Sequence, residues 1–196
     1  MSRKEIQEQR IRTYFIDSTR EILKSEGLKG LNVRAVSERA GYSYATLYNY
    51  FKDIKDLVFI CVRGFQEECE QYIESQTATL VSGKAKIKAI YKAYISFFVQ
   101  YPGIFELFFL EQMNSIGGKQ PTSELIYTFP DRLCEKEFLY CEENQILTSS
   151  ETDILKSDLK LAITGLLLFY LHRQQPTSFK AFDETVNSIL GRHLPD

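Results

Sequence analysis

The chain has 196 residues, of which 44% are hydrophobic and 26% charged, and its formal net charge is −2. This composition is ample for a buried core, and the length suits one small and one larger domain. The longest apolar run, Leu161 to Leu171, is far shorter than the roughly 20 residues that cross a bilayer. The first 20 residues are charged and lack the central apolar run of a signal peptide. We therefore expect a soluble, cytoplasmic protein with no membrane partner.

Charge is distributed unevenly along the chain. Residues 1–57 contain 11 Lys and Arg against 8 Asp and Glu, whereas residues 58–196 contain 13 against 18. A nucleic acid would therefore meet the basic end of an otherwise acidic chain. Because the basic excess is small, affinity for DNA should depend on where these side chains lie and on dimerisation.

The sequence lacks the motifs of an enzyme. Di-metal sites in helical proteins use Glu-x-x-His pairs, and neither His172 nor His193 follows a glutamate at that spacing. There is no nucleophile motif and no phosphate-binding glycine loop. Four cysteines form no CxxC pair and are expected to be buried thiols: Cys61, Cys69, Cys134 and Cys141. We expect no enzymatic activity, no cofactor and no metal.

The first predicted element is an amphipathic helix that ends near Gly27. Apolar and small residues recur on one face at helical spacing: Ile11, Phe15, Ser18, Ile22 and Leu23. Basic residues precede and open this helix: Arg3, Lys4, Arg10 and Arg12. These basic residues either contact phosphates or form a solvated arm, and the sequence favours neither.

Two very short helices are predicted between residues 31 and 57. Asn32 can cap the first, because its side-chain oxygen can accept from the free N–H groups of the opening turn. Gly41 suits the left-handed conformation that closes a helix, and Ser43 can cap the second. In that second helix Leu47 and Phe51 lie four residues apart and point inward. The remaining residues form an outer face rich in tyrosine and hydroxyl groups: Tyr44, Thr46, Tyr48, Asn49 and Tyr50.

At these residues a family becomes recognisable. The run from Gly41 to Phe51, GYSYATLYNYF, with Lys55-Asp56-Leu57 beyond it, resembles the signature of the TetR family of one-component transcriptional regulators. The resemblance extends from about Arg10 to Leu57. It implies an all-α fold with a three-helix DNA-binding domain over residues 1–57 and a helical ligand-binding and dimerisation domain over residues 58–196.

The resemblance also implies which residues contact DNA. Five match positions that lie in the major groove: Ser43, Tyr44, Ala45, Thr46 and Asn49. Tyr48, Tyr50 and Lys55 match positions near the phosphates, and Arg34 matches one that reaches a base or the backbone. Members commonly carry lysine where this chain has Ile54. A shift of one residue turns a side chain by about 100° around a helix, so we expect Lys52 and Lys55 to share the phosphate contact, with Asp53 capping the helix that follows.

Helical periodicity continues to the end of the chain and predicts about nine helices in all. A long helix should cover residues 54–80, and the next should end where Tyr101-Pro102-Gly103 must break it. Ile104 to Asn114 predicts a short helix, followed by a broken helical pattern around Pro130. Two further helices should cover about 155–170 and 179–193.

Aromatic residues are concentrated in the middle of the predicted C-terminal domain, which we call the body (residues 58–196). They suggest a ligand pocket, since such pockets are mostly apolar with a few polar groups. The alternative is that these residues only fill a core. The candidate ligand-binding residues are Tyr91, Tyr94, Phe98, Tyr101, Phe105, Phe108, Phe109 and Tyr127.

The last two predicted helices are strongly apolar, which fits either a core or a surface held against a partner. In proteins similar to this one, these helices form a four-helix dimer interface. The candidate interface residues are Leu159, Ile163, Leu166, Leu167, Tyr170, Val186 and Ile189.

The sequence therefore predicts a homodimer that binds a palindromic operator on double-stranded DNA and represses transcription until a small-molecule effector, apolar or aromatic, releases it. Two alternatives stay open. In the first, the protein responds to a protein partner or to no ligand; in the second, it acts as an activator.

Overall fold

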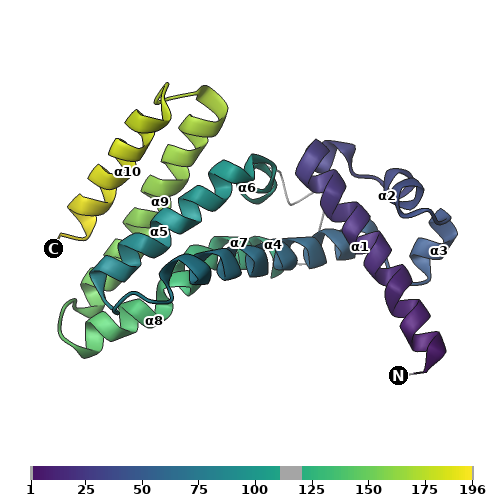
Figure 1. Cartoon of the computed structure of the whole chain (residues 1–196), viewed down its shortest axis with the longest axis horizontal. Coiled ribbons are helices and arrows are strands. Elements are labelled where there is room, and N and C mark those ends of the chain that lie inside the picture. The colour runs from purple at the N-terminus through teal and green to yellow at the C-terminus, as the bar shows by residue number, and fades with distance from the viewer. Residues whose placement is uncertain (1, 111–120, 196) are drawn as a thin grey trace. The chain divides into compact units, whose positions relative to one another are not determined.

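The computed structural model describes residues 2–110 and 121–195, which form ten helices (Figure 1). They are α1 (Arg3–Gly30), α2 (Val33–Ala40), α3 (Tyr44–Tyr48), α4 (Ile54–Thr77), α5 (Lys84–Gln100), α6 (Pro102–Phe109), α7 (Pro121–Tyr127), α8 (Phe129–Glu143), α9 (Ser149–Arg173) and α10 (Phe179–His193). The predicted all-α class is confirmed. The broken pattern around Pro130 is two helices, α7 and α8. The predicted helix over 104–114 begins at Pro102, and its last residues lie outside the described ranges.

Packing divides the chain into two compact units. Unit 1 comprises Met1–Glu67 and Tyr101–Ile126, and unit 2 comprises Glu68–Gln100 and Tyr127–Asp196. Helix α4 contributes residues to both units, and α6 belongs to unit 1. The functional division at residue 57, into a DNA-binding domain and a ligand-binding and dimerisation domain, stays a prediction.

Unit 1 has a small core to which each of its first four helices contributes. The fully or nearly fully buried members are Phe15, Ile22, Val36, Leu47, Phe51 and Leu57. The predicted end of the first helix corresponds to a break at Gly27, whose φ of 66° lies in the left-handed region that favours glycine. The helix then resumes for one short turn to Gly30.

A second glycine brings α6 into close contact with α1 inside unit 1. Helix α5 ends at Gln100 and α6 begins at Pro102, which confirms the predicted break. A Cβ on Gly103 would lie 2.8 Å from the carbonyl oxygen of Lys24 in α1. Only glycine fits at this distance, so the start of α6 lies directly against the backbone of α1.

Unit 2 is built from α5, α8, α9 and α10 with the end of α4. Aromatic rings dominate its interior: Tyr91, Tyr94, Phe98, Phe129, Phe138 and Phe182 are almost completely buried. Two ion pairs join neighbouring helices, Lys86 to Glu137 at 3.0 Å and Lys160 to Asp131 at 2.6 Å. Each basic side chain is largely shielded from solvent, so both pairs are of the kind that destabilises a protein when one partner is removed.

Helices α9 and α10 run side by side at the end of the chain (Figure 1). Thr148 and Glu151 form a capping box at the start of α9. The ring of Tyr170 stacks on that of Phe182 with their centroids 3.9 Å apart, which joins the two helices. None of the described helices combines the length and the apolar character needed to cross a bilayer.

Candidate nucleic-acid interface

The two short helices α2 and α3 are held by the caps that their sequence predicts. The Oδ1 atom of Asn32 accepts from the N–H of Ala35 at 2.9 Å. Gly41 closes α2 with φ of 75°, in the left-handed region. The Oγ atom of Ser43 then accepts from the N–H of Thr46 at 3.1 Å and starts α3. Because these caps satisfy N–H groups that a two-turn helix leaves free, they fix the angle at which α3 leaves the turn.

The division of α3 into an inner and an outer face is confirmed. Leu47 is completely buried and Phe51 is 4% exposed, whereas Tyr44 is 67% and Tyr48 is 53% exposed. Every residue predicted to bind DNA lies at the surface of unit 1, exposed or half-buried: Arg34, Ser43, Tyr44, Ala45, Thr46, Tyr48, Asn49, Tyr50, Lys52 and Lys55. Two exposed aromatic side chains on one short helix form an apolar patch, and such patches mark interaction sites.

A hollow of about 680 Å³ lies between α2 and α3. Its lining residues are Val33, Arg34, Ser37, Glu38, Tyr42, Ser43, Tyr44 and Tyr48. Four of these are among the residues predicted to bind DNA, so the hollow is part of the candidate interface.

Arg12 has a structural role that the sequence left undecided. Its Nη1 atom donates to the carbonyl oxygen of Tyr50 at 3.0 Å, and its guanidinium lies 4.6 Å from the ring centroid of Phe51. The half-buried Arg12 therefore ties α1 to the end of α3. The basic residues Arg3, Lys4 and Arg10 are exposed.

The start of α4 is capped by Asp53, as the sequence predicts. Its Oδ1 atom accepts from the N–H groups of Lys55 at 2.8 Å and Asp56 at 3.0 Å. Asp56 in turn accepts from the N–H of Lys52 at 3.2 Å. A phosphate at this helix start would compete with Asp53 for the same N–H groups. The side chains of Lys52 and Lys55 are exposed, whereas Ile54 is half-buried against the core of unit 1.

Glu38 also lies on this surface, although the sequence did not identify it as part of the interface. Glu38 accepts from the Nε atom of Arg34 at 2.8 Å, and the two side chains are 66% and 87% exposed. This hydrogen bond holds the pKa of Arg34 above its ordinary value. The spacing of four residues on one helix was the available signal.

A family model agrees with this geometry. Residues 15–59 match the model of the bacterial regulatory proteins of the tetR family, and this span contains all of α2 and α3 with their caps. The chain carries the DNA-binding domain of the TetR family. It is a DNA-binding transcriptional regulator with a helix-turn-helix near its N-terminus, and the family is not one of enzymes.

Similar proteins support the assignment of this TetR-family regulator. It is 26% identical over 92 residues to YobS, an uncharacterised helix-turn-helix-type transcriptional regulator of Bacillus subtilis strain 168. That match covers 46% of this chain and 47% of YobS, so it spans about half the length of the relative.

Solved structures of low sequence identity share the fold over nearly the whole chain. FadR of Bacillus subtilis, solved with stearoyl-CoA, is 13% identical, with coverage of 94% and 98% of the two chains and a TM-score of 0.72. A TetR family regulator from Marinobacter aquaeolei VT8 is 14% identical, with coverage of 95% and 96% and a TM-score of 0.67. AibR, solved with isovaleryl coenzyme A and operator DNA, is 12% identical, with coverage of 95% and 98% and a TM-score of 0.63.

The candidate ligand-binding residues are divided between the two units. Unit 2 holds Tyr91, Tyr94 and Phe98, which are buried, and Tyr127, which is 67% exposed. Unit 1 holds Phe105 and Phe108, which are buried, and Tyr101 and Phe109, which are half-buried. Their role in binding a ligand stays a prediction.

Two of these tyrosines carry buried hydroxyl groups that have no hydrogen-bond partner among the residues that the structure describes. The hydroxyls of Tyr91 and Tyr94 are both in this position, as is the Oδ1 atom of Asp131. Burial raises the pKa of both tyrosines well above the ordinary value, and the nearby charge of Asp131 adds to this. Both hydroxyls are therefore neutral donors at physiological pH. An unsatisfied buried polar group costs about 1–3 kcal/mol.

Most of the candidate dimer residues lie inside their own subunit. Leu159, Ile163, Leu167, Val186 and Ile189 are at most 7% exposed, whereas Leu166 and Tyr170 are half-buried. The outer face of α9 instead presents Ile154 (59% exposed), Leu161 (69%) and Phe169 (57%). A Cβ on Gly165 would meet no atom within 4 Å, so this face is open at its middle.

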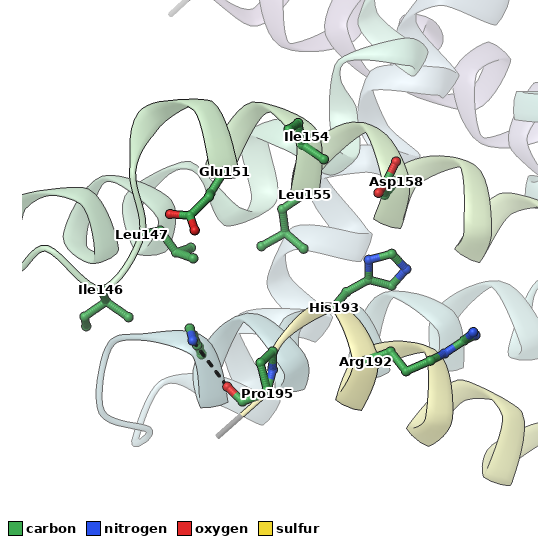
Figure 2. Close-up of a pocket in the computed structure, with 10 residues that line it drawn as sticks. Ile146, Leu147, Glu151, Ile154, Leu155, Asp158, Arg192, His193 and Pro195 are labelled. Carbon is green, nitrogen blue, oxygen red and sulfur yellow. Dashed lines mark hydrogen bonds between the residues drawn. The ribbon is translucent and has the colours of Figure 1, made fainter.

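A second hollow, of about 390 Å³, lies where the first half of α9 faces the C-terminal end of α10 (Figure 2). Figure 2 shows Glu151, Ile154 and Asp158 of α9 on one side, facing Arg192 and His193 of α10 on the other. Lys84 donates to the carbonyl oxygen of Pro195 at 3.3 Å and closes one end. Ile154 belongs both to this hollow and to the exposed face of α9.

Proposed function

We propose that this TetR-family regulator binds a palindromic operator as a homodimer, represses transcription, and is released by an apolar or aromatic small molecule. The observation that carries the proposal is the capped α2–α3 pair, which turns Tyr44 and Tyr48 outward while Leu47 anchors the helix in the core. A cytoplasmic location belongs to the same proposal, because operator DNA lies there.

In the proposed complex α3 enters the major groove. Ser43, Tyr44, Ala45, Thr46 and Asn49 face the base edges, since hydroxyl and amide groups can donate to and accept from the patterns shown there. The backbone contacts come from Tyr48, Tyr50, Lys52 and Lys55. The two lysines bind phosphates through their side chains, because Asp53 occupies the N–H groups at the start of α4.

The proposed homodimer uses the exposed face of α9. Leu161 lies near the middle of that face, between Ile154 and Phe169, and Gly165 beside it would let a second helix approach closely. An isologous contact of this kind gives two-fold symmetry, which is what a palindromic operator requires. The buried candidates such as Leu159 and Ile163 would support this face from beneath.

The proposed effector site uses the aromatic residues of the body. Tyr91 and Tyr94 offer unsatisfied donors in apolar surroundings, which suits a ligand with an apolar body and a hydrogen-bond acceptor. The neighbours FadR and AibR were solved with acyl-CoA molecules, so acyl-CoA compounds are the first class to test. An effector releases DNA only in proportion to its preference for the unbound conformation.

Two measurements test the proposal. Selection of duplexes from a random pool by the full chain should yield an inverted repeat, and enrichment of no sequence would overturn it. Thermal melts should then be recorded with stearoyl-CoA, isovaleryl-CoA, coenzyme A alone and uncharged aromatic compounds. A ligand at about 100 times its Kd stabilises by about 2.7 kcal/mol. The stabilising compound should dissociate the selected duplex; tighter DNA binding would indicate an activator or co-repressor mechanism, and no stabilisation a protein partner or no ligand.

A further inference from the structure

The Arg34–Glu38 pair places an acidic side chain on the surface proposed to meet DNA. Both residues line the hollow between α2 and α3, together with Tyr44 and Tyr48. Glu38 is 66% exposed there, so its charge is not hidden within the protein. A carboxylate on this surface repels phosphates and lowers the affinity for DNA in general.

Helix stability gives only weak support for the placement of the two charges. Helix α2 has eight residues, with Arg34 in its first turn and Glu38 in its last. The helix dipole favours the opposite arrangement, with acidic residues near the N-terminus and basic residues near the C-terminus. The order along the chain is also the weaker one, since a glutamate preceding its basic partner by four residues gives the more favourable pair.

The geometry of the contact suggests what the pair does instead. Glu38 accepts from Arg34 through the Nε atom, on the side edge of the guanidinium. This leaves the end edge, with the two Nη atoms, for a second planar partner. In the major groove that partner is guanine, whose O6 and N7 atoms accept two parallel hydrogen bonds from arginine.

We propose that Glu38 is a specificity-determining residue that positions Arg34 to read a guanine in the operator. Glu38 holds the guanidinium plane in one orientation, and its negative charge weakens binding wherever the guanine is missing. It is a positioning residue, because it acts on the base through Arg34. This inference rests on the sequence-specific binding proposed above.

The test compares two substitutions of Glu38 in the full chain. Glu38→Gln removes the charge but keeps an oxygen that can accept from Arg34, and Glu38→Met removes both. Each variant, with the unaltered chain, selects duplexes from a random pool, and affinities are then measured for the selected duplex and for a random-sequence duplex. Glu8→Gln is the matched control, because Glu8 pairs with Lys4 at 3.9 Å on α1 of the same unit and does not touch Arg34.

Glu38→Gln, Glu38→Met and Glu8→Gln should all tighten binding to the random-sequence duplex, because each substitution removes one negative charge. Only Glu38→Met should lose the preference for guanine at one position of each half-site, by about tenfold, which is the scale of one bidentate contact. Glu38→Gln should keep most of the preference for guanine. Arg34→Lys should abolish this preference although Glu38 is present.

Three outcomes would overturn the inference. Retention of the full guanine preference by Glu38→Met would show that Arg34 needs no positioning, while leaving the proposed function intact. Enrichment of no sequence by the unaltered chain would remove the proposed function and this inference with it. A purely structural role for Glu38 would instead lower the melting temperature of Glu38→Met and weaken binding to both duplexes.

Discussion

The guanidinium of Arg12 donates to the main-chain carbonyl of Tyr50, 38 positions further along the chain, at 3.0 Å. Because Tyr50 lies two residues beyond the end of α3, this side chain adds a polar link between α1 and the segment after α3 to the apolar core that they share. Stacking of the same guanidinium on Phe51 adds a second contact.

Arg12→Met should therefore destabilise the protein even without DNA. A hydrogen bond from a charged donor contributes about 1.5–3 kcal/mol, which corresponds to a melting temperature lower by about 5 °C in a chain of this size. Arg10→Met is the control, since Arg10 is exposed on the same helix. If Arg12→Met weakened DNA binding but left the melting temperature unchanged, Arg12 would be a phosphate contact and not a structural tie.

Base-reading and phosphate-binding residues of the proposed interface should respond differently to substitution. Tyr44→Ala and Asn49→Ala should change which duplexes are selected from a random pool. Lys52→Met and Lys55→Met should weaken binding to every duplex, and each should reduce the slope of log affinity against log salt by about 1. A change of selected sequence in a lysine variant would contradict this assignment.

The four capping residues of the helix-turn-helix could be predicted because each cap depends on neighbouring residues in the sequence. Asn32, Gly41, Ser43 and Asp53 each act within four residues of their own position, so the sequence alone identifies them. The role of Arg12 was not predictable, because its partner lies 38 residues away and is a main-chain carbonyl.

The outward face of α9 was equally hidden in the sequence. This helix is apolar around most of its circumference, and periodicity cannot distinguish the side that faces the core from the side that faces outward. Burial in the structure separates Leu159 and Ile163, which are inside, from Leu161, which is outside. Only after this separation can an interface variant be chosen.

Leu161→Glu should therefore dissociate the proposed dimer without unfolding the subunit. The side chain is 69% exposed, so the charge meets solvent in a monomer but a facing copy of itself in a dimer. Sedimentation velocity should show a shift to monomer, with unchanged helical circular dichroism. The matched control is Leu139→Glu, which is 51% exposed and lies on α8. An unchanged sedimentation coefficient for Leu161→Glu would place any interface elsewhere.

Tyr94→Phe should maintain or increase stability and reduce the response to an effector. The hydroxyl has no partner inside unit 2, so its removal relieves a cost of about 1 kcal/mol or more. The melting temperature without ligand should stay the same or rise, while the shift caused by a stabilising compound should shrink. Tyr127→Phe, at a 67% exposed position, should leave the stability unchanged. A clear loss of stability in Tyr94→Phe would mean that its hydroxyl is satisfied, for instance by a buried water.

Buried thiols should make stability fall at alkaline pH. Burial raises the pKa of Cys61 from 9.0 to about 12. The folded state therefore favours the neutral thiol. The contribution of this preference to the free energy of unfolding is complete below pH 9.0 and is lost as the pH rises towards 12. For one such thiol the free energy of unfolding should fall by about 1.4 kcal/mol per pH unit in that window. Urea unfolding should show a shallower decline for Cys61→Ala, and equal slopes would contradict the assignment.

The contact between Gly103 and the carbonyl of Lys24 leaves no side chain between α6 and α1. Two backbones that touch directly have no rotamers with which to absorb a displacement, so a shift of α6 would also displace α1. Phe105 and Phe108, which belong to the candidate ligand site, lie on α6 itself. If the proposed effector contacts these aromatic side chains, a residue larger than glycine at position 103 should push α6 away from α1 and weaken the effect of that compound on DNA binding.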